Sequence, residues 1–140
     1  MWCWQLVDQE KIHNQCLRDD PTERIHALEK LKNFFSFFPD KQQAWNDLHR
    51  LTNDEDSSVR FGAAYALGSA FSQVPDKQQA WNELIRLTNN EDSYVRDRAA
   101  YALGSAFSQV PDKQQAWNEL HRLTNDEDSI IRSNAAYALG

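Results

Sequence analysis

The sequence predicts an all-α protein, a right-handed α-solenoid of about four stacked helical hairpins. Three observations support this prediction. A block of 36 residues recurs almost unchanged, each regular block opens with Pro-Asp-Lys-Gln-Gln-Ala-Trp-Asn at Pro39, Pro75 and Pro111, and the apolar residues within a block have helical spacing. A fixed period of this length is typical of stacked units that bury their apolar faces against one another.

The period divides one domain, residues 1–140, into four units. Units 2 and 3 cover 39–74 and 75–110 and differ at six positions. Unit 1 (1–38) is degenerate, as expected of a cap, and its turn is two residues shorter if Leu17 is the counterpart of Leu51. Unit 4 (111–140) stops where unit 3 continues, so we expect a truncated unit, a longer parent protein and end-to-end self-association through this unit.

The sequence pattern of each regular unit predicts two antiparallel helices. In unit 2, Asp40 and Gln43 have the spacing of a capping box, and the apolar pattern predicts a helix from about Lys41 to Thr52. An acidic turn then breaks the pattern. We expect Asp56 or Ser57 to cap the second helix, because its side-chain oxygen can accept from the first free backbone N–H groups.

The second helix carries two apolar stripes. One runs from Val59 to Val74 at the spacing of a buried helix face. The other consists of the small residues Ala64 and Gly68, and Gly recurs at the same position in units 3 and 4. Because glycine inside a helix costs up to about 1 kcal/mol relative to alanine, its repetition predicts a close contact between units.

A repeated signature lies at the start of this helix. Residues 56–68 read Asp-Ser-Ser-Val-Arg-Phe-Gly-Ala-Ala-Tyr-Ala-Leu-Gly, and the pattern recurs at 92–104 and, with Ile for Val, at 128–140. It resembles the signature of HEAT repeats, particularly the short HEAT-like units of the phycobilisome-lyase type. The resemblance implies a solenoid whose second helices line the concave side. It leaves the task open, because the family includes protein-binding scaffolds, DNA-binding enzymes and metal enzymes.

No residue pattern suggests catalysis, so we predict a protein that is not an enzyme and binds no cofactor or metal. Cys3 and Cys16 lack the spacing of a zinc site, and we expect plain core or surface thiols. The four histidines form no His-Glu dipeptide, and His49 is replaced by Ile85 in unit 3, which favours a partly buried packing position. Neither Ser nor Cys lies in a strained, glycine-rich turn.

Charged residues recur at the turns. The acidic turns lack the glycine and alternating ligands of a calcium loop, which favours helix capping. An arginine follows an aspartate by four residues in every unit, a spacing that predicts an ion pair within the helix. The resemblance implies, in addition, an Asp and Arg ladder between units. These arginines are Arg24, Arg60, Arg96 and Arg132.

The composition of the chain argues against nucleic acid and membrane as partners. The net charge is −6 and the basic residues are interleaved with carboxylates, so we expect neither DNA nor RNA to bind. No run of 18 or more apolar residues suggests a membrane span, and the segment Met1–Trp4 does not open a signal peptide, so we expect a cytoplasmic protein. The alternatives are a nucleic-acid-binding HEAT-like solenoid and a lyase-like accessory protein.

Three of the six positions at which units 2 and 3 differ, namely 58, 61 and 62 in unit 2, fall on one face of the second helix, away from the buried stripe. Variable residues beside a constant tyrosine suit an adaptable surface, so we predict a protein-interaction scaffold whose partner, another protein, binds here. Neutral drift on a solvated face is the alternative. The predicted partner-binding residues are Ser58, Phe61, Gly62, Tyr65, Tyr94, Asp97, Arg98, Tyr101, Ile130, Ser133, Asn134 and Tyr137.

Overall fold

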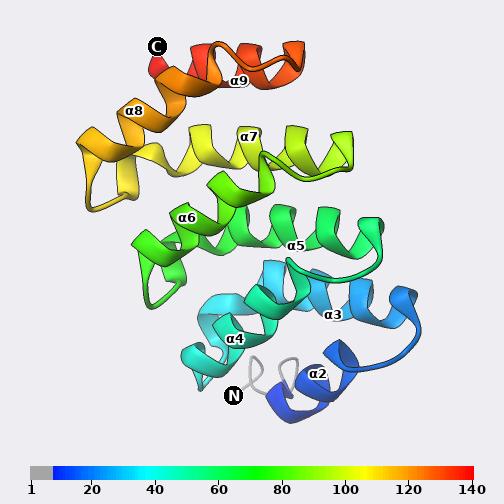
Figure 1. The fold of residues 1–140 in the computed structure, drawn as a ribbon. Coiled ribbons are helices and arrows are strands. Elements are labelled where there is room, and N and C mark those ends of the chain that lie inside the picture. Colours follow the sequence, from blue (N-terminus) through cyan, green and yellow to red (C-terminus); the bar gives the residue numbers. More distant parts are fainter. Residues whose placement is uncertain (1–7) are drawn as a thin grey trace.

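The computed structural model describes residues 8–140, which form a stack of helical hairpins (Figure 1). This part of the chain contains eight α-helices and no strand, so the prediction of an all-α solenoid is confirmed. The segment Met1–Trp4, with Cys3, lies outside the described residues. The helices are α2 (Gln9–Cys16), α3 (Pro21–Phe34), α4 (Lys41–Leu51), α5 (Ser57–Ala70), α6 (Lys77–Leu87), α7 (Ser93–Ala106), α8 (Lys113–Leu123) and α9 (Ser129–Leu139).

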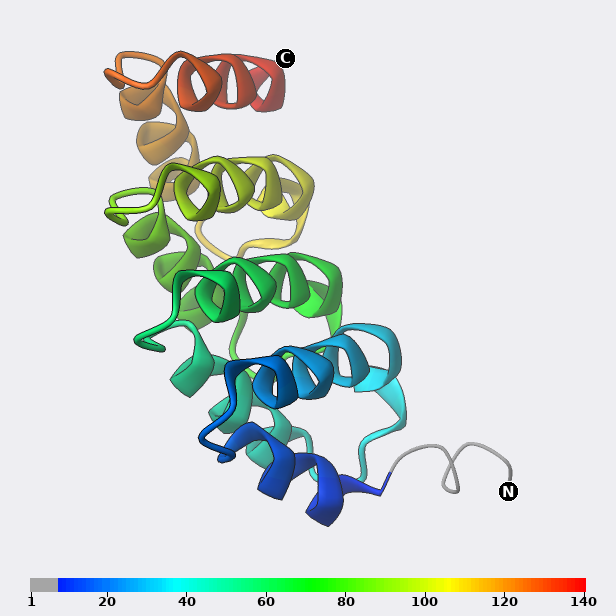
Figure 2. The same ribbon diagram turned by 90° about the vertical axis from the view of Figure 1, so that its right-hand side faces the viewer.

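The hairpins build two layers. The second helices α3, α5, α7 and α9 lie side by side, each packed on the one before it, while α4, α6 and α8 form the other layer (Figures 1 and 2). No helix in residues 8–140 is long and apolar enough to cross a bilayer. The buried residues follow the two layers as one extended core, which is the expected consequence of stacking similar units.

The predicted aspartate caps are confirmed in the first and second helices. The reciprocal bond of a capping box is not formed in unit 2, because the Asp40 N–H donates to Gln9 Oε1 and not to Gln43. Asp40 accepts a hydrogen bond from the backbone N–H of Gln43 at 3.0 Å, and α4 starts at the next residue, Lys41. Asp56, rather than Ser57, caps α5 and accepts from the N–H groups of Ser58 and Val59. Both aspartates have extended backbones, as helix caps require, and the equivalent aspartates of the later units likewise accept from backbone N–H groups in the first turn of their helices.

The second helix is shorter than its apolar stripe. α5 ends at Ala70, and the 3-10 turn Phe71–Gln73 follows before Val74, which is still buried. The tighter turn redirects the chain toward the next hairpin, and Phe71 stays in the core while the α-helix stops.

Unit 1 differs from the prediction in its turn. Leu17 is 54% exposed, and Cys16 occupies the buried position at the end of α2 that Leu51 holds at the end of α4. The turn of unit 1 is residues 17–20 and that of unit 2 is residues 52–56, so it is one residue shorter, not two. Cys16 is buried in the core, as predicted for a core thiol. Burial, followed by the nearby charge of Asp47, raises the pKa of this thiol to about 12.

The small-residue seam is the contact between second helices. A Cβ built on Gly68 would lie 2.9 Å from the Cβ of Ala102 in α7, and one built on Gly104 would lie 3.3 Å from the Cβ of Ala138 in α9. Neighbouring helices therefore approach as closely as glycine permits, and the predicted role of the seam is confirmed.

Three of the recurrent arginines, Arg24, Arg60 and Arg96, reach the next unit instead of pairing within their helices, whereas Arg132 binds carbonyl oxygens of its own turn. The predicted pair between Asp20 and Arg24 is wrong, because the Asp20 carboxylate caps α3 by accepting from Thr22 N–H at 2.9 Å. Arg24 reaches the next unit and binds both oxygens of Asp54 at 2.8 and 3.0 Å, and this hydrogen bonding raises the pKa of Arg24. The later units form longer ion pairs with their neighbours: Arg60 lies 3.5 Å from Glu91, and Arg96 lies 3.6 Å from Asp128.

The acidic turns are held by their own side chains. Asp54 accepts from the backbone N–H of Asp56 at 2.9 Å, and Asn90 accepts from that of Asp92 at 3.0 Å. An amide oxygen makes the same bond as a carboxylate, so the Asn of unit 3 preserves the turn. The structural role predicted for these residues is confirmed.

Candidate protein-binding face

The predicted partner-binding residues lie on one surface, formed by α5, α7 and α9, which we call the second-helix face. Its large apolar side chains are exposed to very different degrees, from 36% for Tyr65 to 73% for Tyr94 and 89% for Tyr137. Ser58, Phe61, Tyr101, Ile130 and Ser133 are also exposed, and Gly62, Asp97, Arg98 and Asn134 are half-buried. The structure therefore brings the twelve residues together on one side of the solenoid.

Two cations are stacked on the tyrosines of this face. The guanidinium carbon of Arg98 lies 3.6 Å from the ring centroid of Tyr65 and 4.8 Å from that of Tyr101. Lys32, on α3, places its Nζ 4.4 Å from the Tyr65 centroid. Arg98 therefore joins α5 and α7 through cation–π contacts.

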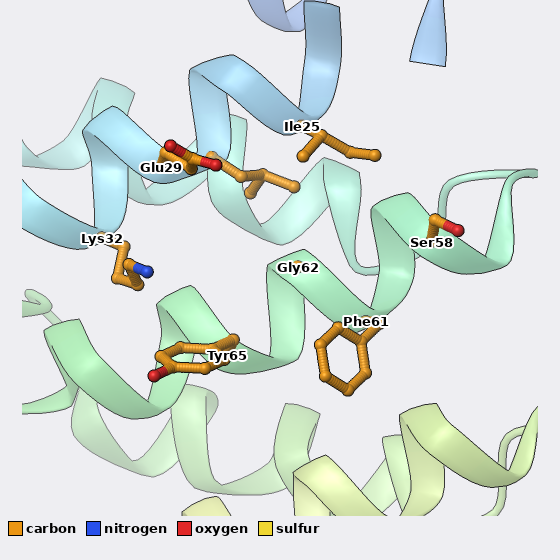
Figure 3. A pocket seen from close by; sticks show the side chains of 8 residues that line it. Ile25, Glu29, Lys32, Ser58, Phe61, Gly62 and Tyr65 are labelled. Carbon is orange, nitrogen blue, oxygen red and sulfur yellow. The ribbon is translucent and has the colours of Figure 1, made fainter. Parts of the chain in front are cut away.

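A pocket opens between α3 and α5 (Figure 3). Its volume is about 310 Å³. Ile25 and Phe61 lie at one end, and Glu29, Lys32 and Tyr65 lie at the other. Gly62 forms part of the wall and contributes no side chain to fill the space.

Sequence reasoning missed the contribution of α3 to this pocket. Ile25, Glu29 and Lys32 belong to the degenerate unit 1, where comparison of regular repeats says little. One signal was present, because Ile25 precedes Phe61 by one 36-residue period and therefore belongs to the same face. Lys32 had no such signal, since its counterpart in unit 2 is Gly68.

Further hollows continue along the face. Ser58, Phe61 and Tyr94 line one between α5 and α7, of about 470 Å³. Tyr101 and Tyr137 border a smaller one between α7 and α9, of about 170 Å³. Each pair of adjacent second helices therefore leaves a depression bordered by aromatic side chains.

Asp97 is the one acidic residue of the predicted set. Burial raises its pKa, and the charge of Asp128 on the next unit raises it further. The pKa of Asp128 is lowered: burial opposes this, but hydrogen bonds from the N–H groups of Ile130 and Ile131, together with Asp97 and Arg96, favour the ionised form. Ionised Asp97 therefore lies in an unfavourable environment next to a carboxylate that stays charged.

In the layer of α4, α6 and α8, His49 and Glu83 are held by contacts with neighbouring side chains. His49 is half-buried against the Trp45 ring, at a centroid distance of 5.6 Å, which confirms the predicted packing position. Glu83 is buried and accepts from Thr52 Oγ1 at 2.8 Å. In residues 8–140 no cluster of three or more His, Cys, Asp or Glu is arranged to hold a metal ion.

The last hairpin exposes an aromatic side chain in this layer. Trp117 is 44% exposed and borders a hollow with Phe107 and Lys113. End-to-end self-association through this unit stays a prediction.

The repeats identify the family. A family profile described as HEAT repeats matches residues 11–104 and 82–140. The chain belongs to the HEAT repeat family. No curated protein sequence matches it.

Several solved structures share the fold of this HEAT repeat chain. An engineered protein from the Northeast Structural Genomics Consortium is 26% identical, with a TM-score of 0.68, over 94% of this chain and 61% of its own. A second engineered protein from the same consortium is 30% identical, with a TM-score of 0.64, over 93% of this chain and 61% of its own. A designed armadillo repeat protein in complex with the peptide (KR)4 is 20% identical, with a TM-score of 0.67, over 94% of this chain and 63% of its own. The chain therefore spans less than two thirds of the length of these proteins.

Proposed function

We propose that this HEAT repeat chain is a protein-interaction scaffold whose partner binds the second-helix face. The observation that carries the proposal is the row of hollows between successive second helices, each bordered by exposed aromatic side chains. Tyrosine contributes large contact area at low cost in side-chain entropy, which is why it is enriched at interfaces.

The packing of the two layers supports a concave shape for this face. The second helices pack through Gly68 and Gly104, whereas successive first helices touch much less. A stack that is tighter on one side bends toward that side, so the second-helix face would be the inner surface of the curve. An inner surface lets a partner contact several units at once.

Two likenesses bear on the proposal without carrying it. The designed armadillo protein holds a peptide, but at 20% identity the likeness shows the fold alone. The signature of the phycobilisome-lyase type suggests an accessory role, and no residue of the face favours it.

The charges of the face disfavour binding of nucleic acid. The cations nearest the hollows, Lys32 and Arg98, are already stacked on tyrosine rings and are too few to replace many counterions.

The test uses substitutions that another unit already tolerates. Tyr94 and Ile130 occupy the position that Ser58 holds in unit 2, so the double variant Y94S/I130S should fold normally. We expect it to bind proteins captured from the source organism at least about 30-fold more weakly, as loss of an aromatic anchor at about 2 kcal/mol implies. Affinity for a captured partner is measured by titration with the purified chain.

The matched control is on the opposite layer. Asn82 and Asn118 are exposed on α6 and α8, and N82A/N118A should bind the partner as tightly as the parent chain does. If Y94S/I130S binds normally and N82A/N118A does not, recognition belongs to the first helices and the proposal is wrong.

A further inference from the structure

We infer that the pocket between α3 and α5, with Lys32 and Arg98 beside it, selects an extended acidic segment that carries one large apolar side chain. This rests on the proposed function and narrows it to one partner chemistry. The apolar side chain would enter the pocket between Ile25 and Phe61, and a carboxylate would lie near the two cations (Figure 3).

The pocket has the size and lining for a single side chain. Its volume of about 310 Å³ is at the lower limit of small-molecule sites, which span about 300–1,000 Å³. Ile25, Leu28 and Phe61 make one end apolar. The space exists because position 62 is glycine, whereas the same position holds Arg98 in unit 3 and Asn134 in unit 4. A large apolar residue of a partner would therefore find its place at unit 2 and not at the later units.

The charge beside the pocket is net positive. In the described part of the chain, neither Lys32 nor Arg98 forms an ion pair with a carboxylate. Arg98 Nε is also buried with no hydrogen-bond partner there. Stacking on Tyr65 holds both cations in place and leaves their charge available. Glu29 lies at the same end of the pocket and opposes a carboxylate, but it is a single charge against two.

The length of the pocket sets the register of the segment. Lys32 follows Ile25 by seven residues on α3 and Tyr65 follows Phe61 by four on α5, and both cations stack on Tyr65. At 1.5 Å per helical residue, the apolar end and the charged end are therefore about 6–10 Å apart. An extended chain covers about 3.3 Å per residue. The carboxylate should therefore follow the apolar residue by two or three positions.

The experiment titrates the isotope-labelled chain with three short blocked peptides and follows its amide resonances. The first is Gly-Ser-Phe-Ser-Glu-Glu-Gly-Ser, the second has Lys-Lys in place of Glu-Glu, and the third has Ser in place of Phe. We expect saturable shifts around Lys32, Gly62 and Tyr65 with the first peptide. The Lys and Ser peptides should bind at least about tenfold more weakly.

Two repeat-derived variants test the two halves of the site. G62N installs the unit 4 residue, and its Cβ would meet the terminal Cδ1 of Leu28 at 3.2 Å, which that flexible methyl group can relieve. We expect G62N to fold and to lose the preference for Phe over Ser. R98N also installs the unit 4 residue and should lose most of the preference for Glu over Lys.

Three results would overturn the inference: no saturable shifts at the pocket, equal or tighter binding of the Lys peptide, or unchanged Phe preference in G62N. Failure of this inference is distinguishable from failure of the proposed function. If Y94S/I130S loses its captured partner while G62N keeps it, the face binds proteins but the pocket is not the acidic-segment site. If neither variant affects the partner, both proposals fail.

Discussion

Units 3 and 4 begin with nearly the same residues and place them in different environments. Trp81 and Trp117 occupy the same position in the repeated motif, yet Trp81 is 1% exposed and Trp117 is 44% exposed. Trp81 contacts Phe107, from the 3-10 turn after α7, and the following hairpin α8–α9 stacks on its unit. α8 has no later hairpin in the structure against it.

This comparison shows that the burial of a motif residue in a solenoid depends on the position of its unit in the stack and not on the motif alone. The same holds for acidic groups. Glu83 and Glu119 each bind the arginine three residues later in their own helix, but Glu83 is also buried against Thr52 of unit 2, whereas Glu119 is only half-buried. The same motif can therefore contribute core residues in one unit and surface residues in the next.

The test with the largest expected effect on stability replaces each tryptophan with alanine. W81A should lower the free energy of unfolding by about 3–5 kcal/mol, because it empties a fully buried site. W117A should cost no more than about 2 kcal/mol, since almost half of that side chain already faces solvent. Urea unfolding followed by circular dichroism measures both values. Equal losses would mean that the two units bury their motifs alike in solution.

A second test compares the two glycines of the seam. G68A should destabilise the chain by about 1–3 kcal/mol, because the new Cβ would lie 2.9 Å from Ala102 Cβ and neither atom can move without its helix. G104A meets Ala138 at 3.3 Å, and the gain in helix propensity, about 1 kcal/mol, should offset most of its cost. The unfolding midpoints of the two variants compare them directly. A stabilised G68A would show that the seam is not closely packed.

The smallest expected effect is a pH-dependent change in stability that arises at the contact between α7 and α9. Asp97 has a raised pKa in the folded chain because of burial and of Asp128. The folded state therefore holds the Asp97 proton more tightly than the unfolded state, so this group's contribution to stability falls as pH rises from the unfolded value of about 3.9 through the raised folded pKa. D97N removes the charge while its amide can still donate to Asp128.

We expect D97N to be more stable than the parent at pH 7 by a few tenths of a kcal/mol, as is usual for a partly exposed position. The advantage should vanish near pH 3. The control is S133N, at the same position in unit 4, which should show no such pH dependence. A D97N advantage that is equal at both pH values would exclude ionisation as the cause.

The sequence by itself determined the repeating part of this protein. The 36-residue period, the aspartate caps at Asp40 and Asp56 and the glycine of the seam predicted the hairpins, their starts and the face by which they stack. These features depend on interactions within a helix turn or on steric limits at one position, and such interactions are encoded locally. Alternation of constant and variable positions likewise indicated which side of the second helix is exposed.

Only the tertiary structure decided which side chains meet across units, beyond the general Asp and Arg ladder that the resemblance implied. The sequence predicted that Arg24 would pair with Asp20, but that carboxylate caps its own helix and Arg24 binds Asp54 of the next unit. It also gave no sign that Lys32 and Arg98 would stack on Tyr65, or that α3 would form half of the main pocket. Long charged side chains choose among several partners within reach. That choice depends on the distance and rotation between hairpins, which no spacing within one unit encodes.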